Sequence, residues 1–148
     1  QHSKMTKRIL SVDLGDKRTG LAVSDEMCVL ASGIGCIKED YIVYIADAVA
    51  KKAAEYDVCK IVVGNPVNMN GTKGPRSEKA QGFAALLGEK TDVPIVLFDE
   101  RLTTVSAHQY MNMTNTRGKK RKETVDTLSA EIILQNYLDY LRNHPSEA

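Results

Sequence analysis

The chain has 148 residues, which is enough for one domain with a substantial core and too few for two lobes of ordinary size. Its hydrophobic fraction of 43% and charged fraction of 26% are near the globular average, which excludes a disordered or fibrous protein. No apolar run approaches the roughly 18 residues that span a bilayer, and no signal-peptide pattern is present, so we expect a cytoplasmic protein without a membrane partner.

The two ends are expected to lie outside the folded unit. Residues 1–4 resemble the remnant of an expression tag ahead of a natural start at Met5. We expect a single domain over residues 5–142, followed by a short tail over residues 143–148.

The first third of the chain predicts three strands joined by short turns. Residues 8–13, 19–24 and 29–37 are rich in apolar and β-branched side chains, and Gly15 follows the first of these segments. Connections this short favour an antiparallel meander.

Helices and buried strands alternate in the rest of the chain. Apolar residues recur at helical spacing over residues 40–56, with Asp40 available as an N-cap, and residues 60–63 form the continuous apolar run of a strand buried on both faces. A helix over 76–90 and a buried strand over 93–98 follow. The next helix is expected to begin at Thr103 or Thr104 and to end at about 111. A mobile basic stretch over 114–121 then leads to an amphipathic helix from about 123 to 142.

This order of elements predicts an α/β fold. Three antiparallel strands followed by two parallel strands require a mixed five-stranded sheet with helices on both faces. Ligands of open α/β sheets bind at the carboxyl ends of the strands, so the functional site is expected at that edge.

Acidic residues lie where the predicted strands end. Asp13 closes the first strand, Asp99 and Glu100 follow the last one, and Asp126 lies early in the final helix. If that helix crosses the sheet near these ends, three carboxylates converge. The residues alone leave open whether Asp99 or Glu100 belongs to the group.

Small side chains at Ser129 and Ala130 permit the close approach of the final helix that this convergence needs. Two carboxylates about 5 Å apart repel by roughly 3 kcal/mol at an effective dielectric constant near 20, so a cluster of three requires cations. Mg²⁺ or Mn²⁺ fits, since hard divalent ions prefer oxygen ligands. Two such ions about 4 Å apart can activate an attacking water and stabilise the leaving oxygen of a phosphodiester.

Each acid also has a purely structural interpretation. Asp13 can accept hydrogen bonds in its own turn, and Asp99 or Glu100 can pair with Arg101. Asp126 can be a solvated helix residue. Their shared location at strand ends and at a helix start favours the metal site.

Other catalytic signatures are missing from the sequence. It contains no Gly-x-Ser-x-Gly elbow, no complete P-loop and no Cys or His pair with zinc spacing. Cys28, Cys36 and Cys59 are expected to be reduced and partly buried. His108 and His144 are expected to be surface or helix-packing residues.

Basic residues gather near the acids although the formal net charge is only +1. They are Lys119, Lys120, Arg121 and Lys122 before Asp126, and Lys17 and Arg18 after Asp13. Such charges draw phosphates toward metal-bearing carboxylates. With no Trp and only two Phe to stack on bases, we expect a nucleic-acid partner that is contacted through its backbone. A monomer and a homodimer both remain open.

Four segments of the chain resemble the YqgF/RuvX family. They are residues 13–25 (DLGDKRTGLAVSD), residues 63–66 (VGNP) through Asn70-Gly71, residues 99–104 (DERLTT), and residues 119–122 with Val125-Asp126. The match runs from about Lys7 to Leu141, and four motifs in this order and at these spacings are specific.

The resemblance implies a ribonuclease H-like fold, related to that of the RuvC Holliday junction resolvases, and a bacterial nuclease. It implies maturation of the 5′ end of pre-16S rRNA, with structured RNA or a ribosomal particle as partner, and junction resolution on branched DNA as the older suggestion. The acidic positions of the family fall on Asp13, Glu100 and Asp126. The candidate nucleic-acid-binding residues are Lys17, Arg18, Arg101, Thr103, Thr104, Lys119, Lys120, Arg121 and Lys122.

The second carboxylate departs from the pattern of the related resolvases. There it comes from the strand beside the first, whereas here that strand ends in Gly64-Asn65-Pro66 without an acid. Glu100 is therefore expected to reach from the next strand over, a lateral shift of about 4.8 Å.

Two other functions compete with the nuclease. The strand-turn-strand around Gly15 and Gly20 is similar to the phosphate cradle of sugar kinases and actin, but those proteins need two such domains. A non-catalytic RNA-binding or ribosome-assembly factor would use the basic stretch alone, and loss of the acids would not affect it.

Overall fold

The computed structural model describes residues 7–66, 70–71, 74–102 and 118–147. For residues 102, 118–126 and 147 it describes the backbone alone.

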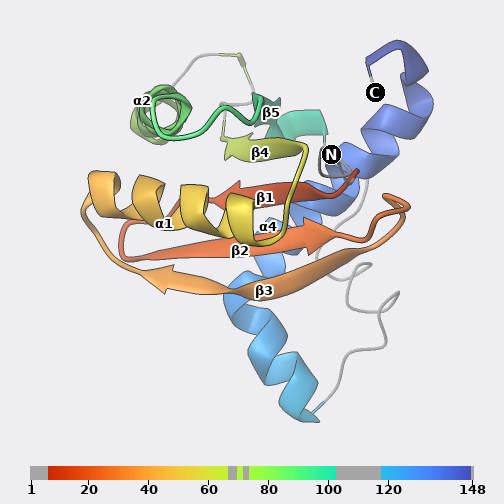
Figure 1. Cartoon of the computed structure of the whole chain (residues 1–148), viewed down its shortest axis with the longest axis horizontal. Helices are drawn as coiled ribbons and strands as arrows, with labels where there is room; N and C mark the ends of the chain where they lie inside the picture. The colour runs from red at the N-terminus through yellow and green to blue at the C-terminus, as the bar shows by residue number, and fades with distance from the viewer. Residues whose placement is uncertain (1–6, 67–69, 72–73, 103–117, 148) are drawn as a thin grey trace, which may run out of the picture.

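A mixed sheet joins an antiparallel meander to two parallel strands (Figure 1). Its strands are β1 (Ile9–Asp13), β2 (Arg18–Ser24), β3 (Ala31–Lys38), β4 (Lys60–Asn65) and β5 (Ile95–Asp99), arranged in the order β3-β2-β1-β4-β5. The pairs β1–β2 and β2–β3 are antiparallel, and the pairs β1–β4 and β4–β5 are parallel. The predicted five-stranded sheet, with three antiparallel strands followed by two parallel ones, is confirmed.

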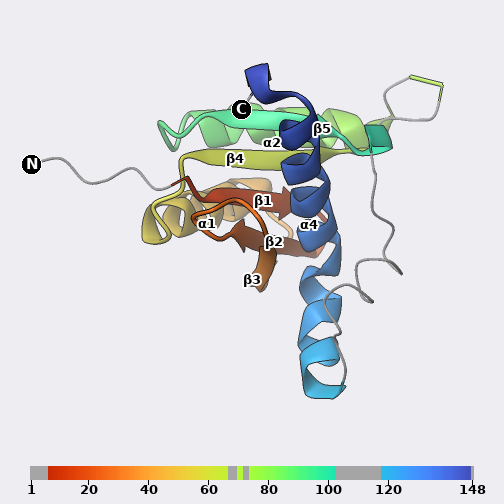
Figure 2. The ribbon, with the colours of Figure 1, turned by 90° about the vertical axis from the view of Figure 1, so that its right-hand side faces the viewer.

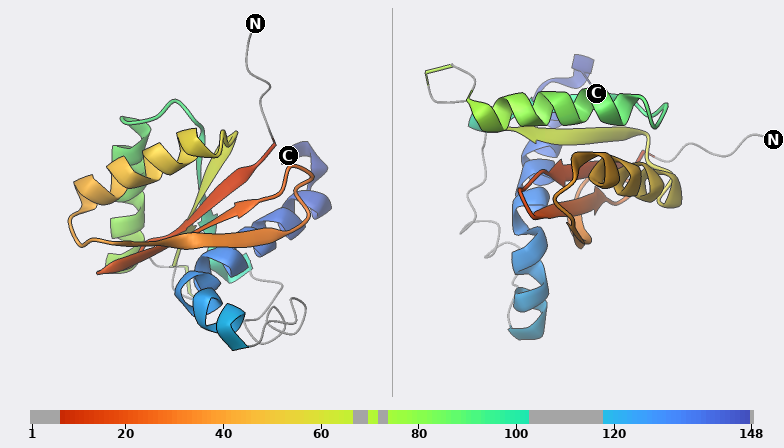
Figure 3. Two further views of the ribbon diagram at one scale, coloured as in Figure 1. Left: turned by 60° about the horizontal axis from the view of Figure 1, so that its bottom comes forward. Right: turned by 90° about the vertical axis from the view of Figure 1, so that its left-hand side faces the viewer.

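Helices cover both faces of the sheet, as predicted. The helices α1 (Ile42–Glu55) and α2 (Pro75–Gly88) lie on one face, and α4 (Gly118–Asn143) crosses the other (Figure 3). Single-turn 3₁₀ helices η1 (Glu100–Leu102) and η2 (Pro145–Glu147) follow β5 and α4. Among the described helices, none combines the length and apolar character needed to cross a membrane.

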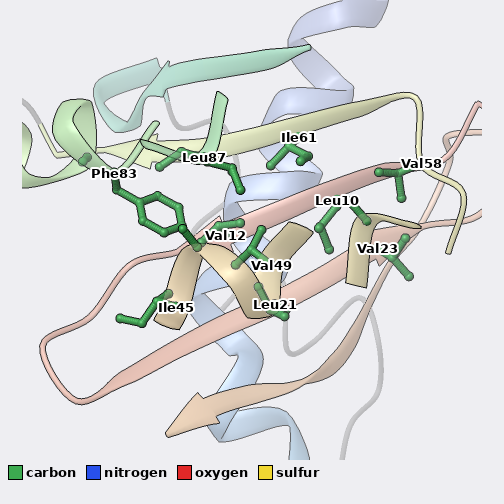
Figure 4. Close-up of a cluster of buried hydrophobic side chains, with 14 residues drawn as sticks. Leu10, Val12, Leu21, Val23, Ile45, Val49, Val58, Ile61, Phe83 and Leu87 are labelled. Carbon is green, nitrogen blue, oxygen red and sulfur yellow. The ribbon is translucent and has the colours of Figure 1, made fainter. Parts of the chain in front are cut away.

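Alternation of side chains gives the sheet two different faces. Leu10 and Val12 of β1 pack toward α1 and α2, whereas Ile9 and Ser11 face α4. Burying a large apolar side chain contributes about 1.5–3 kcal/mol before entropy is counted, so the core under α1 and α2 anchors the sheet. Figure 4 labels its side chains Leu10, Val12, Leu21, Val23, Ile45, Val49, Val58, Ile61, Phe83 and Leu87.

The helix α4 lies directly against the other face because small residues meet there. The Ser11 hydroxyl donates a buried hydrogen bond of 2.6 Å to the carbonyl oxygen of Ala130. At Gly33 of β3, an added Cβ would lie 2.1 Å from Oγ1 of Thr127 and 2.5 Å from Oε2 of Glu131. The close approach expected at Ala130 is confirmed.

The helix α4 also begins earlier than the sequence pattern predicts. Residues 118–121, expected to belong to a mobile stretch, form the first turn of the helix. Lys and Arg have high helix propensity, so this segment forms a helix although it contains no apolar residues that pack against the sheet. The amino-terminal turns of α4 project past β3, beyond the sheet (Figure 2). The predicted helix from residue 103 or 104 to about 111 lies outside the described residues.

The prediction that Asp40 caps α1 is wrong. Tyr41 occupies the N-cap position and makes no side-chain capping hydrogen bond. Oε2 of Glu39 instead accepts the backbone N–H groups of Asp40 at 3.2 Å and of Tyr41 at 3.1 Å. The longer Glu39 side chain thus reaches the start of the helix from the preceding residue.

The cysteines agree with the sequence prediction, and so does the one histidine within the described segments. Cys28, Cys36 and Cys59 are free thiols of intermediate burial. His144 is exposed and stacks on Tyr140, with 4.1 Å between the ring centroids. His108 lies outside the described residues.

Substitutions at two glycines test the contact between α4 and the sheet. Gly33→Ala should lower the free energy of unfolding by about 1–3 kcal/mol, because the new methyl group forces α4 away from β3. Gly82→Ala in α2 is the matched control, since an added Cβ there meets nothing within 4 Å. It should stabilise the protein by about 0.5–1 kcal/mol through higher helix propensity. Urea unfolding measures both, and equal changes in the two variants would contradict this packing.

Candidate active site

A pocket of about 260 Å³ opens at the carboxyl edge of the strands. It lies below the roughly 300–1,000 Å³ of sites that enclose drug-sized ligands, so its size suits a backbone phosphate and hydrated ions better than an enclosed base. Residues from both helical layers and from the strand ends form its walls. They are Asp13, Leu14, Asp16, Gly64, Pro66, Arg76, Lys79, Ala80, Glu100 and Ser129.

Two of the three predicted carboxylates meet in this pocket. Asp13 is the last residue of β1, and Glu100 is the first residue of η1, immediately after β5. The strand β4 lies between β1 and β5, so the two side chains come from strands that are not neighbours.

The glycine at the end of β4 explains how Glu100 reaches across that strand. Gly64 belongs to β4, the strand between β1 and β5, and pairs with Phe98 of β5. An added Cβ at Gly64 would lie 2.7 Å from Oε2 of Glu100 and 2.6 Å from Cδ1 of Ile133. The space that a side chain would fill on β4 is therefore taken by the Glu100 carboxylate. The expected lateral reach of Glu100 thus has a structural basis.

The shared pocket disfavours the charged form of both acids. Burial raises the pKa of Asp13, against the opposing effects of the Arg76 charge and a hydrogen bond from Ser129. Burial also raises the pKa of Glu100, and the negative charge of Asp13 raises it further, whereas Arg76 lowers it. A cation bound between the two carboxylates would relieve this repulsion.

Asp99, the other candidate for the second carboxylate, is paired with a neighbouring side chain. The Arg101 guanidinium donates to Oδ2 of Asp99 at 2.7 Å, and the Arg101 backbone N–H donates to Oδ1 at 2.9 Å. The side-chain hydrogen bonds from Arg101 hold the pKa of Asp99 below its ordinary value. The structural interpretation of Asp99 as a partner of Arg101 is confirmed, and this pairing favours Glu100 as a metal ligand.

The helix α4 supplies the third side of the site. Ser129 lines the pocket and donates a hydrogen bond to the Asp13 carboxylate. Asp126 lies in α4 three residues before Ser129, so the two positions share one face of the helix. The Asp126 side chain lies outside the described part of the structure.

Among the candidate nucleic-acid-binding residues whose side chains the structure describes, none lines the pocket. Lys17 and Arg18 are exposed at the start of β2, and Arg101 is exposed and bound to Asp99. The backbones of Lys119, Lys120, Arg121 and Lys122 lie in the projecting first turns of α4, and their side chains are outside the described set. Thr103 and Thr104 also lie outside it.

Two basic residues of the pocket are absent from the sequence prediction. Arg76 and Lys79 lie in the first turns of α2 and line the wall formed by that helix. Nothing in the local sequence marks them, because a charged residue early in an amphipathic helix is ordinarily solvated. Only the tertiary arrangement brings them to the acids.

The donor set fits a hard divalent cation. Carboxylate oxygens and a hydroxyl are the ligands that Mg²⁺ and Mn²⁺ prefer. The described side chains contain no cluster of three or more acids, histidines or cysteines that could hold a metal. Among the described side chains, the candidate site therefore holds two of the predicted carboxylates, those of Asp13 and Glu100.

Comparison with known proteins identifies the family of this chain. Residues 7–140 match the sequence profile of RuvX, which is described as a Holliday junction resolvase. The chain belongs to the RuvX family.

Close relatives of this RuvX chain share nearly half of its residues. A protein of Ruminiclostridium cellulolyticum is 46% identical over 133 residues, which cover 89% of this chain and 94% of the relative. A protein of Bacillus licheniformis is 46% identical over 138 residues, which cover 92% and 99%. Both are provisionally named pre-16S rRNA nuclease.

Solved structures show the same fold at low sequence identity. RuvC of Thermus thermophilus superposes with a TM-score of 0.58 at 12% identity, covering 90% of this chain and 96% of RuvC. The same protein bound to a Holliday junction gives a TM-score of 0.55 at 13% identity, covering 90% and 95%. The RuvX chain thus has the ribonuclease H-like fold predicted from its motifs.

Removing one charge from the acid pair should stabilise the apo protein. The pKa of Glu100 is higher in the folded protein than in the unfolded chain, where it is near 4.3. Protonation of Glu100 therefore stabilises the fold. This stabilisation is complete below the unfolded pKa and is lost as the pH rises through the folded pKa. Glu100→Gln should therefore match wild type near pH 4 and exceed it at pH 7 in EDTA. Because water screens part of this side chain, we expect about 1 kcal/mol, or about 2–4 °C in Tm.

The exposed Glu89→Gln is the matched control and should leave the Tm unchanged at both pH values. Thermal unfolding followed by circular dichroism measures all three proteins. A Glu100→Gln variant that is less stable than wild type at pH 7 would show that the Glu100 charge is not repelled in the fold.

Proposed function

We propose that this RuvX protein is a metal-dependent nuclease that hydrolyses phosphodiester bonds, with Asp13, Glu100 and Asp126 as the metal-binding carboxylates. The observation that carries the proposal is the meeting of Asp13 and Glu100 in one pocket, where burial raises both pKa values and the negative charge of Asp13 raises the pKa of Glu100 further. Perturbed carboxyls in a cleft at the carboxyl edge of an α/β sheet are typical of a catalytic site.

The proposed substrate is the 5′ end of pre-16S rRNA. Relatives that are 46% identical over almost their whole length carry the name pre-16S rRNA nuclease. A four-way DNA junction is the second candidate. The family description names Holliday junction resolution, and RuvC, which shares the fold, has been solved with such a junction.

Each residue of the site has a separate task in this proposal. The carboxylates of Asp13, Glu100 and Asp126 hold the divalent ions. When bound, these ions supply an activated water and stabilise the oxygen that leaves the phosphorus. The Ser129 hydroxyl fixes the orientation of the Asp13 carboxylate through its hydrogen bond.

The rest of the binding surface is proposed to follow the projecting end of α4. Lys119, Lys120, Arg121 and Lys122 occupy its first turns, and the figures show these turns extending past β3 (Figures 1 and 2). A basic helix end beyond the sheet gives a long substrate phosphate contacts away from the pocket. Such contacts add affinity that does not depend on base sequence.

Cleavage assays on two substrates test the proposal. We expect Mg²⁺- or Mn²⁺-dependent cutting of a 5′-extended 16S rRNA transcript and no cutting in EDTA. Asp13→Asn keeps an acceptor for Ser129 but removes the charge, and it should lower kcat at least about 100-fold while binding is retained. A four-way DNA junction assayed in parallel distinguishes the two substrates.

The matched control is Asp92→Asn, which removes one carboxylate from the exposed loop before β5 and should cut at the wild-type rate. If wild type and Asp13→Asn bind both substrates equally and neither protein cuts either one, the nuclease proposal is wrong. The protein would then be a non-catalytic nucleic-acid-binding factor.

A further inference from the structure

The wall of the pocket opposite the sheet edge is positively charged. Arg76 lies in the first turn of α2, and Lys79 follows one turn later on the same side of the helix. Lys79 is engaged locally, with its Nζ 3.2 Å from Oδ1 of Asp16 and 3.5 Å from the carbonyl oxygen of Gly15. Arg76 is exposed and lines the same pocket as Asp13 and Glu100.

Arg76 acts on both carboxylates of the proposed metal site. Its positive charge lowers the pKa of Asp13 and the pKa of Glu100, opposing the larger effect of burial in each case. Arg76 also lines the same pocket as both acids. It enters the site from the layer of α2, whereas Ser129 enters from α4 on the other face of the sheet.

The backbone that carries Arg76 is fixed to the sheet beside the site. The neighbouring Ser77 is fully buried, and its hydroxyl donates a hydrogen bond of 2.6 Å to Oδ1 of Asn65. Gln81 donates to the same hydroxyl oxygen at 3.1 Å. Asn65 follows Gly64, the residue over which Glu100 extends. The backbone of Arg76 therefore has a defined position relative to the acids.

The start of α2 is suited to an anion. Gly74 is its N-cap and makes no side-chain capping hydrogen bond, and Pro75 occupies the first helical position. The amino-terminal end of a helix carries partial positive charge, and no side chain of the N-cap residue competes for it. Arg76 and Lys79 add full charges at the same place.

We propose that Arg76 binds the non-bridging oxygens of the scissile phosphate and holds that phosphate against the acid pair. This inference rests on the proposed nuclease function and names the residue that positions its substrate. Two carboxylates repel an incoming phosphodiester, so a cation is needed on the far side of the phosphate as well as between the acids. Guanidinium is matched to this task because its planar donors bind two phosphate oxygens at once.

The experiment compares Arg76→Gln and Arg76→Lys with wild type on the RNA transcript or DNA junction that wild type cuts. Arg76→Gln should lower kcat about 100-fold, with KM within about threefold, because the lost contact orients the phosphate in the transition state. Arg76→Lys should restore part of kcat, and guanidinium ion in the buffer should partly rescue Arg76→Gln. Lys51→Gln, which removes one exposed charge from α1, is the control and should cut normally.

A binding measurement in EDTA separates this inference from the proposed function. Arg76→Gln should reduce the slope of log K against the logarithm of the salt concentration by about 0.7–0.9, which corresponds to the loss of one phosphate contact. If wild type cuts neither substrate, the nuclease proposal fails, and the salt slope alone decides whether Arg76 contacts phosphate. An unchanged slope overturns the inference. So does a drop in kcat that neither lysine nor guanidinium relieves, since that result indicates a structural role.

Discussion

The burial of two carboxylates in one pocket is the constraint on which the rest of this structure depends. Burial raises the pKa of Asp13 and of Glu100, and the negative charge of Asp13 raises the pKa of Glu100 further. A fold keeps such a pair only if other interactions offset its cost, as the hydrogen bond from Ser129 and the charge of Arg76 do here. A divalent cation bound between the two carboxylates would lower the cost of their charges further.

The two faces of the sheet divide the work of stability and of function. The face under α1 and α2 buries the larger apolar core, which holds the strand ends in register (Figure 4). The face under α4 accepts a helix at close range, because Ser11 and Gly33 leave space for it. That proximity brings Ser129 to Asp13. The absence of a side chain at Gly64 opens the remaining gap, so Glu100 can join the site from a strand that does not touch β1.

The sequence was sufficient to predict the mixed sheet, because strand periodicity and short connections leave few arrangements. It also indicated Asp13 and Glu100, since acids at strand ends follow a general rule. Sequence could not exclude Asp99, because its pairing with Arg101 depends on side-chain geometry. Nor could it find Arg76, whose position in a solvated first turn carries no local signal. The error at Asp40 has a similar cause, since the Glu39 carboxylate binds the backbone N–H groups of Asp40 and Tyr41 just ahead of the helix.

The central claim is that Asp13 and Glu100 form one cation site across Gly64. Crystals grown with Mn²⁺, measured for anomalous scattering, test it most directly. The account predicts an anomalous peak about 2.0–2.4 Å from oxygens of both carboxylates, with Asp99 still bound to Arg101. A strong peak at Asp99, or Mn²⁺ bound elsewhere on the protein while Asp13 and Glu100 remain without it, would contradict the claim.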